Sequence, residues 1–453
     1  MVNAGLEPRV GRQAIDADFA VDAALLETAL KVAKLELETR CEIRETKSAP
    51  DPTNSRDNGP AVTPEVEAFR PEDFASWCRR HGRPYVEIFG RTSPSKSYIE
   101  RPGTRQPMAF KSIRPTIFYG QLQGATILAP TALICTPDGA LIYDGFLHRS
   151  DFFAHTLPPD VRVGQRIDES DSGRATYDTP IETECVHIGG SQNFGHFVFE
   201  SLLKLAVLHW CPRIQALPIA VHDALPARFL EFLDILGFSA DRRIRIPFDR
   251  PSRFKHAWVV PHPMRTKTSH SDFGVLPEAL HALRLACAGL QRLASLQRSR
   301  LYLDRSDARW RRLANETEIL PILGQFGVTG VEMSALPARD QISLVSSAEI
   351  IVLQLGAGGA ITAFAPPDCV VIELSPRHVQ AMWRPPLFAS ILGQIIYRIV
   401  GRRASPEDAA AFGLKLADRI MDADADYLIE TDQLAAALAI ADDICRRNAS
   451  TQR

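Results

Sequence analysis

A glycine-rich loop follows an apolar run in the C-terminal half of the sequence. The run 350–355 predicts a buried strand, and Gly356, Ala357 and Gly358 come directly after it. Glycines allow close approach of a ligand, and backbone amides at such a loop, together with the N-terminus of the following helix, can hold a phosphate or pyrophosphate. Glu373 ends the next predicted strand, where a carboxylate can accept hydrogen bonds from ribose hydroxyls. The pattern therefore predicts a nucleotide site. The alternative is that the glycines only allow close packing of helix and strand and that Glu373 is a solvated strand end.

An arginine-rich loop follows another predicted strand, 301–303. The carboxyl ends of strands face the ligand crevice in open α/β sheets, so guanidinium groups there can offset diphosphate charge through bidentate hydrogen bonds. Arg305 and Arg312 are the best candidates for this role. The alternative is a solvated loop in which Asn315 and Glu318 form a helix-capping box.

A third set of polar residues lies on a predicted helix at 194–210, after Gly189 and Gly190. His196, Glu200 and Lys204 fall four residues apart and share one face of that helix. His196 or Glu200 could act as a general base and take a proton from an acceptor hydroxyl. The alternative is a solvated polar stripe, with His196 as a satisfied core histidine.

No residue pattern predicts a metal site. The eight cysteines are scattered without close pairs, which favours buried free thiols over a zinc or redox motif. Asp422, Asp424 and Asp426 resemble the start of a calcium loop, but Tyr427 stands in place of its glycine, so a solvated loop is expected.

Predicted strands and helices must position these residues. Residues 16–45 have apolar positions at roughly helical spacing, and 47–64 read as a linker rich in Pro, Asn, Ser and Asp. Short predicted strands open the first globular half, and from residue 185 onward strands alternate with helices. The alternation restarts after a predicted helix at 277–296, which indicates a second α/β half with a parallel sheet. The N-terminal helix is either a docking or self-association element or packs on its own domain.

Size and composition bound the class of protein. At 453 residues and 45% hydrophobic content, the chain suits two domains. The net charge of −2 provides no overall positive field for nucleic acid, so no nucleic-acid partner is expected. Charged residues interrupt the first thirty positions, and no apolar run reaches the length of a membrane span. The expected location is cytoplasmic, with peripheral attachment at the inner membrane as an alternative.

Taken in order, the segments from Cys185 to Pro376 resemble glycosyltransferase family 61, whose bacterial members are often described as capsular polysaccharide biosynthesis proteins. The stretch 193–200, Asn-Phe-Gly-His-Phe-Val-Phe-Glu, is similar to the family's Asn-aromatic-x-His-Trp-x-x-Glu signature. The other matching positions are Arg305, Arg312, Asn315, Glu316, Gln341 with its neighbours Asp340 and Ile342, Pro366 and Glu373. The sequence departs from the family at Leu355, where a histidine is usual, and at Ala363, where an asparagine is usual.

The resemblance implies a GT-B architecture, in which two Rossmann-like domains face each other across a cleft. The expected division is an N-terminal helix and linker at 1–64, an acceptor-side domain at 65–270 and a nucleotide-sugar-binding domain at 271–453. The implied reaction is inverting, metal-independent transfer of a hexosyl or pentosyl group from a nucleotide sugar, expected to be a UDP-sugar, to a glycan or lipid-linked saccharide. No separate cofactor is implied.

The residues predicted to perform this reaction divide between the two domains. His196 and Glu200 are the expected catalytic residues. The expected donor-binding residues are Arg305, Arg312, Asn315, Gln341, Gly356, Ala357, Gly358 and Glu373.

Two alternatives to an active transferase stay open. The first follows from the departures from the family pattern at Leu355 and Ala363, and the second follows from the glycine loop. A catalytically inactive relative would bind a nucleotide sugar or glycan and act as an assembly partner. An NAD-dependent oxidoreductase is the third hypothesis. It is weakened because Ile361 stands where the dinucleotide fingerprint has its third glycine, and because no separate catalytic constellation accompanies the loop.

Overall fold

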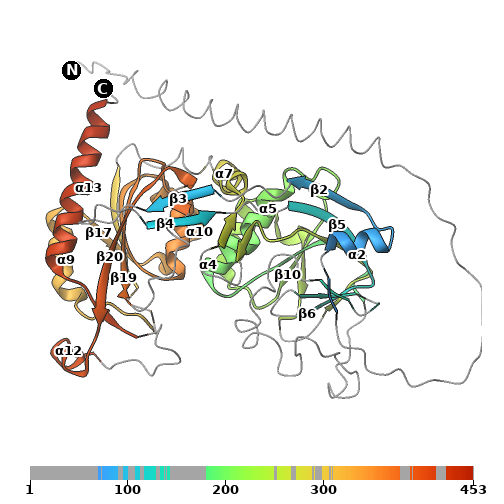
Figure 1. The fold of residues 1–453 in the computed structure, drawn as a ribbon, viewed down its shortest axis with the longest axis horizontal. Helices are drawn as coiled ribbons and strands as arrows, with labels where there is room; N and C mark the ends of the chain where they lie inside the picture. The colour runs from blue at the N-terminus through green and yellow to red at the C-terminus, as the bar shows by residue number, and fades with distance from the viewer. Residues whose placement is uncertain are drawn as a thin grey trace, which may run out of the picture.

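The chain folds into two α/β halves that lie side by side along the long axis of the molecule (Figure 1). The computed structural model describes residues 70–72, 74–89, 95–99, 108–112, 117–128, 133–136, 138, 140–142, 180–248, 252–266, 272–287, 290, 298–305, 308, 310–377, 388–389, 391–414 and 425–451. The predicted helix at 16–45 and the linker at 47–64 lie outside the described residues.

A six-stranded sheet forms the centre of the C-terminal half. Its strands are β16 (Ser299–Leu303), β17 (Thr329–Val331), β18 (Ala348–Gln354), β19 (Val370–Pro376), β20 (Ile395–Arg403) and β21 (Tyr427–Leu428). The order is β17-β16-β18-β19-β20-β21, with parallel pairing up to β20 and antiparallel pairing of β21. The chain passes from β16 to β17 on one side of the sheet, and β18, β19 and β20 follow on the other side of β16. The order of connection therefore switches between β16 and β18, and the loops after these two strands flank the crevice where doubly wound sheets bind ligands.

The N-terminal half contains a second six-stranded sheet, ordered β11-β10-β9-β13-β5-β2. Its strands are β2 (Tyr85–Phe89), β5 (Ile117–Gln123), β9 (Cys185–Gly189), β10 (Ile219–His222), β11 (Arg243–Ile246) and β13 (His256–Val259). The four strands from β11 to β13 are parallel, whereas β5 and β2 are antiparallel additions. Here the order in which the chain connects the strands switches between β9 and β13. The loops after these two strands therefore flank a second predicted ligand crevice.

Two smaller sheets complete the strands of the N-terminal region. One contains β1 (Arg70–Glu72), β6 (Thr126–Leu128), β7 (Leu133–Cys135), β8 (Ala140–Ile142) and β12 (Ser252–Arg253); the other contains β3 (Ser95–Ile99), β4 (Met108–Ser112), β14 (Met264–Thr266) and β15 (Asp272–Val275). The predicted parallel sheets with crossover helices are therefore confirmed, and mixed pairing surrounds them.

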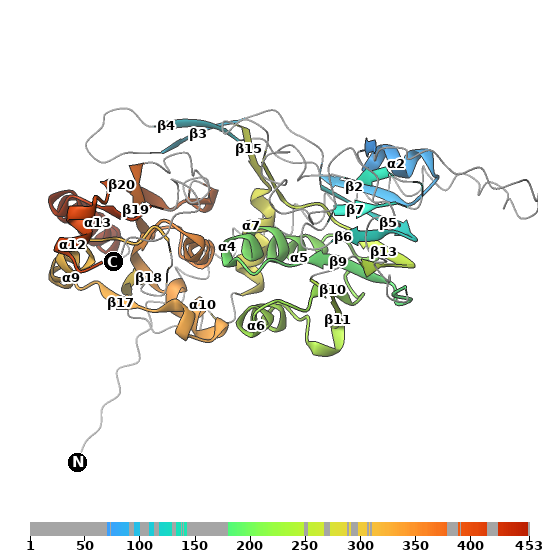
Figure 2. The same ribbon diagram turned by 90° about the horizontal axis from the view of Figure 1, so that it is seen from below.

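Helices cover the faces of both large sheets and meet between them. They are α2 (Phe74–Arg80), α4 (Phe194–His196), the π-helix η1 (Phe197–Leu202), α5 (Leu203–Leu208), α6 (Ala227–Ile235), η2 (Ala240–Arg242), α7 (Pro277–Ala286), α9 (Glu316–Gln325), η3 (Met333–Ala335), α10 (Ala338–Ser346), the 3₁₀ helix η4 (Ala357–Phe364), α12 (Pro406–Ala411) and α13 (Thr431–Thr451). Figure 2 shows α4, α6 and α10 in the region between the two sheets.

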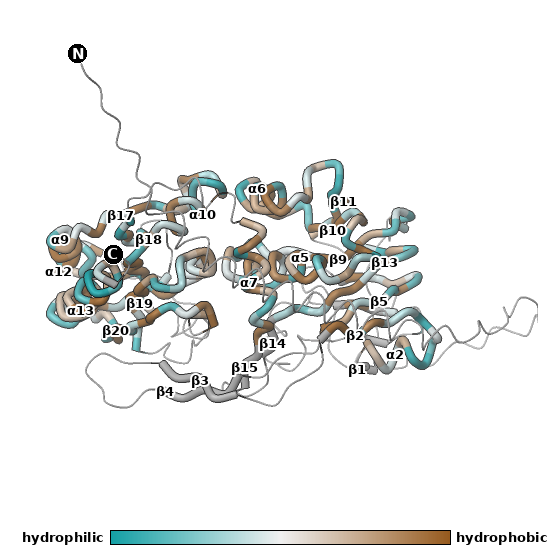
Figure 3. Tube along the Cα trace, turned by 90° about the horizontal axis from the view of Figure 1, so that it is seen from above, coloured by the Kyte–Doolittle hydropathy of each residue, from teal (hydrophilic) through white to brown (hydrophobic). Residues whose placement is uncertain are grey.

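The strands with continuous apolar runs are those at the centres of the sheets. Every residue of β9, β10 and β19 is buried, as expected for parallel strands covered on both faces. Figure 3 shows these apolar residues along the strands and along the helices packed on them.

One apolar cluster runs through both halves. It includes Phe197, Phe232, Ile342 and Phe364, which come from α4-η1, α6, α10 and η4. Phe199 stacks on Phe388 with ring centroids 4.0 Å apart. The halves are therefore joined by a shared core at this junction, while the predicted cleft between two Rossmann-like domains, and the boundary near residue 270, stay predictions.

Several elements differ from the sequence-based expectation. The helix predicted at 194–210 is three segments with a π-helix in the middle, and the described helix α7 ends at Ala286. The prediction missed β20 and α13, although β20 continues the parallel sheet and α13 is the longest helix described. Helix α13 packs beside α9, next to β19 and β20.

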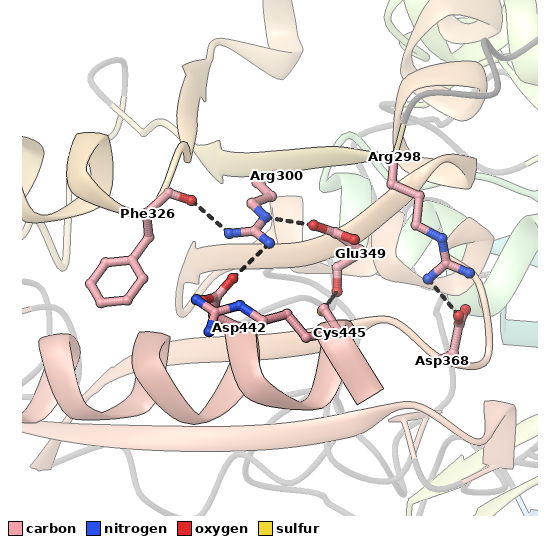
Figure 4. A network of polar contacts seen from close by, with 8 residues as sticks. Arg298, Arg300, Phe326, Glu349, Asp368, Asp442 and Cys445 are labelled. Atoms are coloured by element: carbon pink, nitrogen blue, oxygen red, sulfur yellow. Dashed lines mark hydrogen bonds and ion pairs between the residues drawn. The ribbon is translucent and has the colours of Figure 1, made fainter. Parts of the chain in front are cut away.

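An ion-pair network fastens α13 to the amino edge of the C-terminal sheet (Figure 4). Arg300 at the start of β16 donates to Glu349 at 2.5 Å and to Asp442 of α13 at 2.8 Å. A further guanidinium nitrogen donates to the backbone carbonyl of Phe326 at 2.9 Å. This network stabilises the amino edge, so the opposite, carboxyl edge of the sheet is the one available to a ligand.

Candidate functional site

The turn after β9 positions the helix that carries the predicted base. Gly189 and Gly190 have φ values of 76° and 141°, in the region that disfavours side chains, so the chain can turn sharply out of the strand. Asn193 then caps the helix, because its side-chain oxygen accepts a hydrogen bond from the backbone amide of His196 at 3.2 Å. The cap fixes where the His196 side chain enters the junction.

His196 and Glu200 form a direct pair on this helix. Nδ1 of His196 lies 2.5 Å from Oε1 of Glu200, and the two side chains are 24% and 12% exposed. A carboxylate at Nδ1 favours the tautomer with its proton there and leaves Nε2 as an acceptor. The pair is neither a solvated stripe nor a core histidine: it is a partly exposed dyad whose geometry is compatible with general base chemistry.

A π-helical turn lies at the same place. Residues Phe197–Leu202 follow an i to i+5 pattern, within which Glu200 is the polar residue that is not buried. Such wide turns are rare and often occur at functional sites. Leu203 closes the turn by donating from its backbone amide to the carbonyl of Val198.

The glycine loop and Arg305 lie together at the carboxyl edge of the C-terminal sheet. Nη1 of Arg305 donates to the backbone carbonyl of Leu355 at 2.6 Å. A Cβ added at Gly356 would lie 2.5 Å from the same nitrogen, so a larger residue there would require the guanidinium to shift. A Cβ at Gly358 would meet nothing within 4 Å, and Gly358 is exposed. The predicted neighbourhood of Arg305, Gly356, Ala357 and Gly358 is thus present.

The predicted base and the glycine loop meet where the two halves join. A Cβ at Gly195 would lie 3.4 Å from Cα and 3.5 Å from the carbonyl oxygen of Ala357. Helix α4 packs on η4, so His196, the next residue along, lies one step from this contact. The tertiary structure thus packs the helix segment that begins the dyad against the candidate phosphate loop.

Arg312 is held by an internal ion pair instead. Its Nη2 lies 2.7 Å from Oδ2 of Asp426, and its backbone amide donates to Oδ1 of the same carboxylate at 2.8 Å. The Asp426 side chain is 0% exposed, so the expectation of a solvated loop is wrong for this residue. The pair attaches the arginine-rich loop to the segment before β21, and this geometry opposes the predicted role of Arg312 in phosphate binding.

The side chains of Asn315 and Gln341 also form hydrogen bonds within the fold. The Asn315 amide exchanges hydrogen bonds with the backbone of Ile429, at 3.0 and 3.3 Å, and donates to Glu318. The capping box expected for Asn315 and Glu318 is absent, because no side-chain cap bond forms at this N-cap. Gln341 is buried and donates to the carbonyl of Leu336 at 2.8 Å, which closes the start of α10. No described contact brings either residue to the glycine loop.

Glu373 does not end its strand, contrary to the prediction. It lies in the middle of β19, which continues to Pro376, and it is fully buried. Its cross-strand partner in the register is Arg398, whose Nε lies 2.5 Å from Oε1 of Glu373. Burial raises the pKa of Glu373, and Arg398 opposes that rise. A carboxylate enclosed in this way disfavours the predicted ribose contact.

Sequence reasoning missed a buried network below the glycine loop. The Gln354 amide donates to the Tyr302 hydroxyl at 2.6 Å and to Glu316 at 3.0 Å, and the Tyr302 hydroxyl also donates to Glu316. Burial raises the pKa of both Tyr302 and Glu316. A signal was available, since Gln354 is a polar residue directly after the apolar run 350–353. The network fixes the strand ends from which the arginine and glycine loops start.

Three properties of the described residues bear on the class of site. Within the described ranges, no group of three or more His, Cys, Asp or Glu side chains is arranged to hold a metal ion. Among the helices that the structure describes, none combines the length and hydrophobicity needed to span a bilayer. The described cysteines are buried free thiols, as predicted.

Fold and site together define a mixed α/β protein with a candidate ligand site where the carboxyl edges of two parallel sheets meet. Residues 194–372 match the family model Glycosyltransferase 61, which supports classifying this segment with that family. The predicted resemblance is therefore confirmed over the stretch from α4 to β19.

Two further comparisons were made. The chain is similar to a solved structure of the dodecameric iron-containing heptosyltransferase TibC in complex with ADP-D-beta-D-heptose, with 10% sequence identity, 80% of this chain and 100% of that chain covered, and a TM-score of 0.29. No curated protein matches the chain at a significant level. The assignment to the glycosyltransferases therefore depends on the family segment.

Proposed function

We propose that the protein is an active glycosyltransferase that moves a hexosyl or pentosyl group from a nucleotide sugar, for which a UDP-sugar is the first choice, to a glycan or lipid-linked acceptor. The observation that carries the proposal is the contact between α4 and the glycine loop, where Gly195 approaches Ala357. It brings a candidate base and a candidate diphosphate cradle to one place, within the segment that matches the family.

The proposed reaction inverts the anomeric carbon. The acceptor hydroxyl oxygen attacks that carbon, its proton passes to Nε2 of His196, and the bond from the anomeric carbon to the diphosphate oxygen breaks. Glu200 holds the proton on Nδ1 of His196 throughout. The nucleoside diphosphate leaves with the bonding electron pair, and Arg305 with the backbone amides of the glycine loop offsets its charge.

The proposal also includes the biosynthetic pathway in which the transferase acts. Family members in bacteria are often described as capsular polysaccharide biosynthesis proteins, and we propose that this chain builds a surface or capsular polysaccharide. Leu355 and Ala363 stand where the family usually has a histidine and an asparagine. Both side chains are buried, at 2% and 1% exposure, so neither faces a ligand directly. The backbone of Leu355 still accepts the hydrogen bond from Arg305.

A donor panel tests the proposal. The full chain is incubated with UDP-, GDP- and CMP-sugars, with and without saccharide acceptors, and release of nucleotide and formation of product are measured. We expect turnover of a UDP-sugar and formation of a product with inverted anomeric configuration. Binding without turnover, unaffected by His196→Ala, would instead support an inactive assembly partner. Thermal stabilisation by NAD and not by UDP would support the oxidoreductase hypothesis.

A further inference from the structure

Helix α10 in the C-terminal half is capped by a side chain from the N-terminal half. Oε2 of Glu231, on α6, accepts a hydrogen bond from the backbone amide of Ala338 at 2.7 Å. Ala338 is the first residue of α10 and is fully buried, and the residue before it, Pro337, forms no side-chain cap bond. A buried backbone amide needs a partner, and the first amides of a helix have none within the helix. Glu231, 107 positions away in the sequence, therefore supplies a cap that α10 lacks locally.

Helix α6 also packs on the segment that carries the candidate base. The ring of Phe229 stacks on the ring of Phe197, with centroids 4.7 Å apart and an interplanar angle of 17°. Phe197 follows His196 directly and lies fully buried at the start of η1. A side chain of α6 two positions before Glu231 therefore holds the base helix.

The same helix contacts the segment that follows the glycine loop. The ring of Phe232, next to Glu231, stacks on Phe364 at the end of η4, with centroids 6.2 Å apart. Phe232 also meets Phe197 in a T-shaped arrangement at 6.3 Å. Helix α10 packs on both α6 and η4, and Figure 2 shows α4, α6 and α10 in one region. Residues 229–232 of α6 thus contact the base helix, the end of η4 and the start of α10.

The hydrogen bond from α10 to Glu231 restricts this junction more than the ring contacts do. Apolar contacts are non-directional, whereas a hydrogen bond weakens steeply when its geometry departs from linear. The carboxylate also lies at the positive end of the α10 dipole, which strengthens the interaction. The bond therefore fixes where α10 begins relative to α6. Because α10 packs on η4, it also restricts the position of η4 relative to the base helix.

We propose that Glu231 is a positioning residue of the transferase site: by capping α10 across the junction, it holds η4 and the glycine loop at the distance from His196 that the transfer requires. The inference rests on the proposed function, because it assigns a role in aligning the same site. No described contact joins Glu231 to the dyad or to the glycine loop, so it acts through α6 and α10. Arg305 and the glycine loop both belong to the C-terminal half. Loss of the cap should therefore slow the transfer step and leave donor binding nearly intact.

The test compares three variants of the full chain. Glu231→Ala removes the cap, whereas Glu231→Gln keeps a side-chain oxygen that can accept the same hydrogen bond. Ser405→Ala is the matched control, because it removes the cap of another helix, α12. There the Ser405 hydroxyl accepts from the backbone amide of Asp408 at 3.2 Å, and the Asp408 carboxylate accepts from the backbone amide of Ser405 at 2.8 Å. Helix α12 lies away from α4 and α10 in both ribbon views (Figures 1 and 2).

Thermal unfolding and steady-state kinetics are measured for each variant. Both alanine variants should lower Tm by about 2–5 °C, because each loses one helix cap. With the nucleotide sugar that the wild type turns over, Glu231→Ala should lower kcat about 10- to 100-fold at nearly unchanged donor KM, because a small displacement between reacting groups is enough for such a loss. Glu231→Gln should stay within about threefold of the wild type, and Ser405→Ala should keep the wild-type kcat.

Equal kcat values for Glu231→Ala and Ser405→Ala would overturn the proposal, because the cap would then matter only for stability. A Glu231→Gln variant as slow as Glu231→Ala would overturn it as well. If the wild type turns over no donor, the proposed function fails, and amide hydrogen exchange decides the role of Glu231 separately. Faster exchange at both 194–203 and 357–364 in Glu231→Ala, absent in Ser405→Ala, supports the positioning role. Faster exchange confined to 338–342, or no change, contradicts it.

Discussion

The carboxyl edges of the two parallel sheets hold similar residue types in different states. At the N-terminal edge, His196 and Glu200 pair with each other and stay partly exposed beside the other half. In the C-terminal half, Arg312 after β16 and Glu373 within β19 are paired with Asp426 and Arg398, and these partners are almost fully buried. A charged residue predicted to lie near a strand end is therefore a ligand candidate only where no buried ion pair within the protein neutralises its charge.

The comparison also separates Arg305 from the other predicted donor residues. Arg305 donates to the Leu355 carbonyl and packs over Gly356, so it stays at the loop where a diphosphate would bind. Arg312, Asn315 and Glu373 instead bond to residues distant in the sequence, and Gln341 closes the start of α10. We therefore expect substitutions in the first group to change activity and those in the second group to change stability.

The largest effect is expected at the dyad. His196→Ala should lower kcat by about 10²- to 10⁴-fold, because the acceptor hydroxyl loses its proton acceptor. Steady-state kinetics with the active donor measure this change. His209→Ala is the matched control, since His209 is exposed just after the same helix. Equal kinetics for the two variants would remove His196 from the reaction.

Glu373→Gln should act on folding. Removing one member of a buried ion pair takes the Glu373 carboxylate away from the Arg398 guanidinium, and we expect the free energy of unfolding to fall by about 3–5 kcal/mol. Urea denaturation measures this loss. Glu182→Gln, at an exposed pair with Lys255, should change stability far less. Unchanged stability combined with a raised donor KM would restore the predicted ribose contact.

Arg305→Ala tests the C-terminal edge itself. Loss of charge-assisted hydrogen bonds to the diphosphate, about 1.5–3 kcal/mol, should lower kcat/KM for the donor while stability changes little. Donor titration and thermal unfolding are measured together. Arg312→Ala should show the reverse pattern, because it leaves the buried Asp426 carboxylate without its ion-pair partner. If both variants lose donor affinity equally, the distinction between the two arginines is wrong.

The smallest effect is expected at the glycine loop. Gly356→Ala places a Cβ against the Arg305 guanidinium group, which must move. With an overpacking cost of about 1–3 kcal/mol, we expect the donor KM to rise about tenfold. Gly358→Ala is the matched control, because nothing lies within 4 Å of the added atom. A larger defect at Gly358 than at Gly356 would indicate that the ligand itself occupies that space.

The sequence was sufficient for the central parallel strands from β9 to β19 with the exception of β11. Continuous apolar runs such as those of β9, β18 and β19 are specified by local composition, because a strand covered on both faces needs apolar side chains along its whole length. The sequence did not predict the π-helix η1, since π-helical and α-helical turns are built from the same apolar residue types. It also missed β20 and the C-terminal helix α13, which close the second half.

For the site, the sequence by itself determined which side chains could do chemistry and that a strand precedes each of them. Only the tertiary structure decided which of them remain available. Arg312 and Asp426 are 114 positions apart, and Glu373 and Arg398 are 25 apart, so neither pair can be read from local spacing. A buried charge must find a partner wherever the fold brings one, and that requirement removes some candidates from the ligand site.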